Sequence, residues 1–247
     1  MKAAPEAQLR LLDLQELDTA LDRLDHRKRT LPELAEIQHA EGRLSEFSDA
    51  LVAAQTEISD IDREQKKAEQ DVDQVRARAD RDQKRLDSGQ VSSARDLENL
   101  QSEIASLQRR QSDLEEIVLE VMERREEAET RLRDVDSDRE TSEKTLAELS
   151  ERRDTAYTEL DGQAELHKSA RSGIVADIPD DLMKLYDKLR DQNRGVAAAA
   201  LLRGQCQGCH LQLNTVELNA IRTADKDDVI RCEECRRILV RTKESGL

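Results

Sequence analysis

The chain has 247 residues, of which 38% are charged and 1% are aromatic, and its formal net charge is −15. A globular domain of this length normally buries aromatic side chains in a thick core, and this composition excludes such a core. The chain also has no run of about 18 apolar residues, which excludes a membrane-spanning helix. High charge with regularly spaced Leu, Ile, Val and Ala is typical of long helices packed along a narrow seam.

The N-terminal segment, MKAAPEAQLRLLDLQELD, is acidic and has no continuous apolar stretch. It therefore does not resemble a secretion signal, and we expect a cytoplasmic protein. In that compartment cysteines stay reduced, which favours metal binding over disulfides.

Two helices are predicted for the first arm of the chain. Apolar residues recur at helical spacing from Leu14 onward, but the spacing breaks near Pro32, which we place in the first turn of the second helix. Beyond this point the steps alternate between three and four residues, the period of a coiled-coil seam. The seam positions are Leu44, Phe47, Leu51, Ala54, Ile58, Ile61, Gln65, Ala68, Val72, Val75, Ala79, Asp82 and Leu86.

A second seam of matched length runs from Leu97 to Leu160. Between the two seams, Gly89 supplies a turn, and Ser93 with Asp96 is spaced as a capping box that opens the next helix. Two such seams predict an antiparallel hairpin that turns near Gly89. If the turn is symmetric, residues whose numbers add up to about 180 lie side by side, for example Leu44 and Val135. Polar seam residues such as Gln65 and Arg125 are interpreted as determinants of register.

The pattern changes after about residue 172. Pro179 opens a short helix that Gly195 ends. Two strand–knuckle–strand segments then follow, separated by a short helix that Asn214 or Thr215 caps. The predicted fold is mainly α, with a hairpin at 1–172, a linker and short helix at 173–195, and a small ribbon with short strands at 196–247.

All four cysteines lie in the two knuckles, Cys206 with Cys209 and Cys232 with Cys235. The first pair is followed by His210, and C-x-x-C-H is also the signature of covalent haem attachment, which normally requires export. Two C-x-x-C pairs in one small module instead predict a closed tetrahedral site for one structural Zn²⁺. An iron ion with the same four thiolates is the alternative. We interpret His210 as a surface residue.

The chain resembles the bacterial C4-type zinc-ribbon coiled-coil family. The resemblance is carried by LLDLQELDTALDRLDHRKRTLPEL, by SARDLENLQSEIASLQRRQSDLEEIVLEVMERRE, by IPDDLMKLYDKLR and by the paired knuckles ending RRILV. It implies a helical hairpin with a zinc ribbon whose ligands are the four cysteines, and a nucleic-acid-binding or adaptor role without known catalysis. Ribbon knuckles often have Gly after the second cysteine, whereas this chain has His210 and Arg236.

We expect a protein that is not an enzyme, because four thiolates leave no open coordination position and the chain has no familiar catalytic motif. A small-molecule substrate and a membrane are not expected as partners, and the oligomeric state is open. The acidic hairpin should repel phosphates. The end of the ribbon is more basic, and its candidate partner-binding residues are Arg231, Arg236, Arg237, Arg241 and Lys243.

Two functional hypotheses remain for these basic residues. The first is an adaptor or scaffold whose ribbon binds a protein or nucleic-acid partner. The second is an RNA- or DNA-binding regulatory protein, although the ribbon has no Phe, Tyr or Trp on which bases could stack. A solvated strand edge protected by Arg and Lys explains the same residues without any partner.

Overall fold

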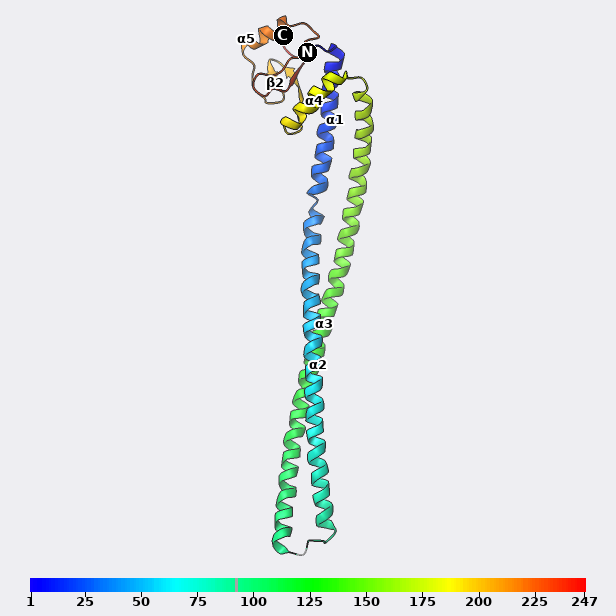
Figure 1. Cartoon of the computed structure of the whole chain (residues 1–247), viewed down its shortest axis with the longest axis vertical. Coiled ribbons are helices and arrows are strands. Elements are labelled where there is room, and N and C mark those ends of the chain that lie inside the picture. Colours follow the sequence, from blue (N-terminus) through cyan, green and yellow to red (C-terminus); the bar gives the residue numbers. More distant parts are fainter. Residues whose placement is uncertain (92) are drawn as a thin grey trace. The chain divides into compact units, whose positions relative to one another are not determined.

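The computed structural model describes residues 1–91 and 93–247, so Ser92, in the loop after Gly89, lies outside the described residues. Its helices are α1 (Pro5–Arg29), α2 (Pro32–Asp87), α3 (Ala94–Val175), α4 (Asp180–Gln192) and α5 (Thr215–Thr223), and its strands are β1 (Ala198–Leu202), β2 (Gln205–Cys206) and β3 (Ile238–Arg241) (Figure 1). The predicted fold class, mainly α with a small stranded module at the C-terminus, is confirmed. None of the helices described here is both long enough and apolar enough to cross a bilayer.

The chain divides into two compact units, one formed by residues 35–149 and the other by residues 1–34 with 150–247. In the first unit α2 and α3 form an antiparallel hairpin (Figure 1). Every predicted seam position in this unit is buried or half-buried. At its centre Ile61, Val121 and Ala128 form an apolar cluster, with Ile58 packed against it. The turn at Gly89 is confirmed by its left-handed φ of 68°, a conformation that glycine adopts without steric cost.

The expected register of the hairpin was wrong by about one heptad. Ion pairs join Arg125 Nε to Asp62 Oδ1 at 2.7 Å and Arg131 Nη2 to Glu57 Oε1 at 2.7 Å, and the numbers of these residues add up to about 187 rather than 180. By the same offset, the residue opposite Leu44 is closer to the buried Ser142 than to Val135. A seam that repeats every seven residues looks the same after a shift of seven, so its periodicity cannot choose between these registers.

In the second unit, the predicted break at Pro32 is confirmed. α1 ends at Arg29, where the N–H of Thr30 bonds to the carbonyls of His26 and Arg27, and α2 begins with Pro32 itself. Proline is suited to this position because the first residues of a helix have no intrahelical acceptor for their N–H groups. The buried residues of α1 pack against α4 and against the strands β1 and β3.

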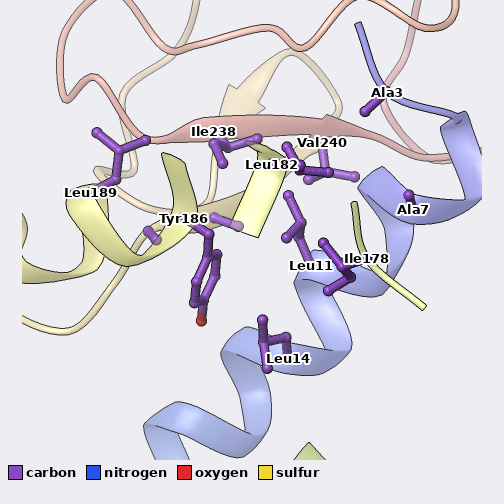
Figure 2. Packing of buried hydrophobic residues seen from close by; sticks show 12 residues of the cluster. Ala3, Ala7, Leu11, Leu14, Ile178, Leu182, Tyr186, Leu189, Ile238 and Val240 are labelled. Atoms are coloured by element: carbon purple, nitrogen blue, oxygen red, sulfur yellow. The ribbon is translucent and has the colours of Figure 1, made fainter. Parts of the chain in front are cut away.

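The core of this unit is apolar and is shared by α1, α4 and the sheet. Leu11 and Leu14 of α1 meet Leu182 and Tyr186 of α4 together with Ile238 of β3 (Figure 2). The α4 helix follows Pro179, as predicted, and ends before Gly195, which has a φ of 88°. A side chain at position 195 would place its Cβ only 2.7 Å from the carboxylate of Asp22, so glycine also permits this close approach.

The sheet has the order β2–β1–β3. β1 and β2 are antiparallel and turn at Arg203 and Gly204, before the first knuckle, whereas β1 and β3 are parallel, with Ala198 opposite Ile238. The return strand predicted after the second knuckle is β3. The pairing predicted across each knuckle is reduced to a single bridge, Gln205 with Gln212 in the first and Arg231 with Ile238 in the second. The parallel pair therefore connects the two knuckles, an arrangement that the separate hairpin patterns did not predict.

Candidate metal centre

The four cysteine thiols converge on one point of the ribbon. All four Sγ atoms lie within 4.8 Å of one another, with Cys206 and Cys235 3.8 Å apart and Cys209 and Cys232 3.9 Å apart. Four sulfurs placed tetrahedrally at about 2.3 Å from Zn²⁺ are separated from one another by about 3.8 Å. The thiols are therefore gathered closely enough to hold a zinc ion, and the ribbon has one such four-cysteine site per chain.

The two knuckles have the same backbone hydrogen bonds. In the first, the N–H of Cys206 donates to Leu211 O at 3.1 Å and the N–H of His210 to Cys206 O at 2.8 Å. In the second, the N–H of Cys232 donates to Arg237 O at 3.0 Å and the N–H of Arg236 to Cys232 O at 2.9 Å. Each knuckle is therefore a tight turn that presents two sulfurs on the same side.

The residue after each knuckle adopts the left-handed conformation that glycine favours. His210 has a φ of 60° and Arg236 a φ of 61°. Such a conformation costs a non-glycine residue roughly 1–2 kcal/mol, which the turn hydrogen bonds and the bound metal offset. Both side chains are exposed, and His210 does not belong to the thiol cluster, which agrees with its interpretation as a surface residue.

Burial and hydrogen bonding act in opposite directions on the thiols. Burial raises the pKa of Cys206 to about 12 against the opposing effect of backbone N–H groups, and it also raises the pKa of Cys232. At Cys235 burial again opposes ionisation, but the backbone and side chain of Arg237 and the nearby thiols lower its pKa to about 7. Thiolates are the metal-binding form, so a cation at the centre compensates the cost of ionising the buried thiols.

Arg237, one of the predicted partner-binding residues, uses its side chain for hydrogen bonds within the protein. Its half-buried guanidinium donates from Nε to Val196 O at 3.0 Å, from Nη1 to Gly208 O at 3.0 Å and from Nη2 to Asn193 O at 3.3 Å. These bonds connect the first knuckle to the segment that follows α4. No sequence pattern signals this role, because the three acceptors are backbone carbonyls.

Arg241 has a similar role at the other end of β3. Its guanidinium donates to the carbonyls of Ala224, Asp225, Lys226 and Asp228, at distances between 2.8 and 3.3 Å. Its charge therefore fixes the loop between α5 and the second knuckle.

The other three basic candidates lie on the surface in two places. Arg231 and Arg236 are neighbours, since Arg231 Nε donates to Arg236 O at 2.8 Å. Lys243 is apart from them and lines a surface groove with Arg241. Their role in binding a partner stays a prediction.

Comparison with known proteins agrees with this architecture. Residues 14–194 match the CT398-like coiled coil hairpin domain, and residues 205–239 match the C4-type zinc ribbon domain. The chain is 35% identical over 241 residues to the uncharacterized protein Rv2229c of Mycobacterium tuberculosis, with 98% of each chain covered.

Solved structures show the same fold. A structurally characterised protein from Mycobacterium smegmatis is 35% identical, covers 98% of this chain and is itself fully covered, with a TM-score of 0.84. CT398 from Chlamydia trachomatis is 18% identical, with 96% and 98% of the two chains covered and a TM-score of 0.72. The second similarity concerns the fold alone.

Proposed function

Because the chain belongs to the CT398-like coiled-coil hairpin family and carries a C4-type zinc ribbon, we propose that it is a non-catalytic adaptor whose ribbon binds a protein or nucleic-acid partner. The observation that carries the proposal is the geometry of the four thiols. They complete a tetrahedral shell, whereas a catalytic zinc keeps one position for water or substrate. The metal then stabilises a small surface rather than activating a reactant.

Arg231 and Arg236 are the surface residues that best support binding through the ribbon. Both are exposed, and neither forms an ion pair within the described part of the chain. Arg231 donates one bond, from Nε to Arg236 O, whereas the guanidinium groups of Arg237 and Arg241 each bind several backbone carbonyls. The pair of exposed arginines is consequently the basic face we assign to a partner.

The test is a pull-down with the full, zinc-loaded chain, with and without nuclease, using the double variant Arg231→Glu/Arg236→Glu. Arg109→Glu/Arg110→Glu is a matched control, since it makes the same charge change at two exposed positions of α3. We expect the ribbon variant to lose the partner and the control to keep it. Equal retention by both variants would contradict binding through this face.

The alternative function, binding of RNA or DNA, is distinguished in the same experiment. A nucleic-acid complex disappears after nuclease treatment, and the ribbon variant should show weaker binding with a flatter salt dependence for all sequences. A protein complex survives nuclease, and the same charge reversal should mainly slow association.

A further inference from the structure

A groove of about 1200 Å³ lies on the second unit, between the start of α1 and the ribbon. Pro5 and Leu9 line it from α1, Leu202 from the end of β1 and Ile221 from α5. Leu9 is 44% exposed, whereas Leu11 and Leu14 of the same helix are completely buried. The groove is thus an apolar surface open to solvent.

Cations surround this apolar surface. Arg222, Lys226 and Lys243 are exposed at its rim, and in the described part of the chain none of the three forms an ion pair. Arg241 adds a fourth positive charge, while Glu244 is the one acidic side chain among the residues that line the groove. This excess of cations is unusual in a chain with a formal net charge of −15, where many Arg side chains pair with Asp or Glu.

From this combination we infer that the groove binds an acidic peptide segment of a partner protein, one that carries leucine or a similar apolar side chain. Carboxylates of the peptide would pair with Lys226, Lys243 and Arg222, while its apolar side chain would contact Leu9 and Leu202. An apolar floor without aromatic rings favours a peptide over a nucleic acid, whose bases would need stacking partners. The inference rests on the proposed adaptor function and adds to it a second binding surface, separate from Arg231 and Arg236, with its own class of partner.

The experiment is a selection from a random-peptide display library against the full, zinc-loaded protein. The enriched peptides should combine Asp or Glu with Leu, Ile, Val, Met or Phe. Their affinities are then measured for Leu9→Ser, which removes an exposed apolar side chain, and for Lys226→Glu/Lys243→Glu, which reverses two exposed charges. Each variant should weaken binding about tenfold or more, while zinc content and helical circular dichroism stay unchanged.

The control is Arg109→Glu/Arg110→Glu, which makes the same charge change at two exposed positions of α3 outside the groove and should leave peptide affinity unchanged. Enrichment of peptides without acidic residues, or equal binding to both groove variants and wild type, would overturn the inference. The two proposals fail separately. Loss of the pull-down partner with Arg231→Glu/Arg236→Glu, together with unchanged peptide affinity in both groove variants, would refute the groove and leave the adaptor proposal standing.

Discussion

At the scale of single residues, side chains of one type have different roles in the ribbon according to what surrounds them. Arg236 and Arg237 are adjacent in sequence, yet Arg236 is exposed whereas Arg237 donates to three backbone carbonyls. A planar guanidinium has several donors in fixed directions and can bond to three carbonyls at once. A lysine ammonium group cannot reproduce this geometry. Local charge therefore overstates the number of arginines available to a partner.

We predict that Arg237→Met lowers the free energy of unfolding of the ribbon by about 2–3 kcal/mol, because partly buried carbonyls lose a charged donor. Arg237→Lys should recover only part of the loss, since it keeps the charge but not the fork. Thermal unfolding of the zinc-loaded protein measures the change, with Arg236→Met as the exposed control, expected within about 0.5 kcal/mol of wild type. Equal losses of stability in Arg236→Met and Arg237→Met would contradict a stabilising role for the three hydrogen bonds of Arg237.

At the scale of elements, a buried polar network joins α1, α3 and α4. Asp18 of α1 is 1% exposed; its Oδ1 accepts from Arg171 Nε at 2.6 Å and its Oδ2 from the hydroxyl of Tyr186 at 2.8 Å. Gln15, one turn earlier, accepts from the N–H of Ala197 at 2.6 Å and donates to Gly195 O at 2.8 Å. These bonds satisfy polar groups whose burial would otherwise be costly and orient α4 against α1.

The network predicts a loss of stability at alkaline pH. Burial raises the pKa of Tyr186, and the charge of Asp18 and its hydrogen bond raise it further, against the opposing effect of Arg190 and Arg171. Above about pH 10 a tyrosine in the unfolded chain loses its proton while the folded chain retains it. The contribution of Tyr186 to the free energy of unfolding is therefore fully present below that pH, and it decreases as the pH rises further.

Tyr186→Phe tests this expectation. The variant should cost about 1 kcal/mol at neutral pH through the lost hydrogen bond, and its stability should fall less steeply above pH 10 than that of wild type. Urea unfolding at several alkaline pH values provides the measurement, and Tyr157→Phe is the control, because Tyr157 lies on α3 outside this network. An unchanged alkaline slope in Tyr186→Phe would show that Tyr186 ionises normally in the folded protein.

At the scale of the whole molecule, the two units have different sources of stability. The hairpin of residues 35–149 is held by a long seam with little burial at each position, whereas the ribbon gathers four cysteine thiols around one metal centre. The ribbon also contributes Ile238 and Val240 to the core that α1 and α4 share. Loss of zinc should therefore affect more than the knuckles, while leaving the hairpin folded.

We predict that Cys232→Ser, or removal of zinc by a chelator, unfolds the ribbon because a small module with few large side chains depends on its metal. Elemental analysis should find about one zinc per wild-type chain, and most of the helical circular dichroism should remain in the variant. Protease digestion then distinguishes the parts, with cleavage confined to the second unit. A ribbon that resists proteolysis without metal would contradict the prediction.

The sequence by itself determined the features that depend on neighbouring residues. The seam positions from Leu44 to Leu86, the break at Pro32 and the four metal ligands were all predicted, because helical periodicity, proline chemistry and C-x-x-C spacing act within a few residues. The tertiary structure decided the hairpin register, the parallel pairing of β1 with β3 and the commitment of Arg237 and Arg241 to backbone carbonyls. Each of these depends on which distant segments meet. A seven-residue repeat is unchanged by a seven-residue shift, and a backbone carbonyl acceptor has no signature in the sequence.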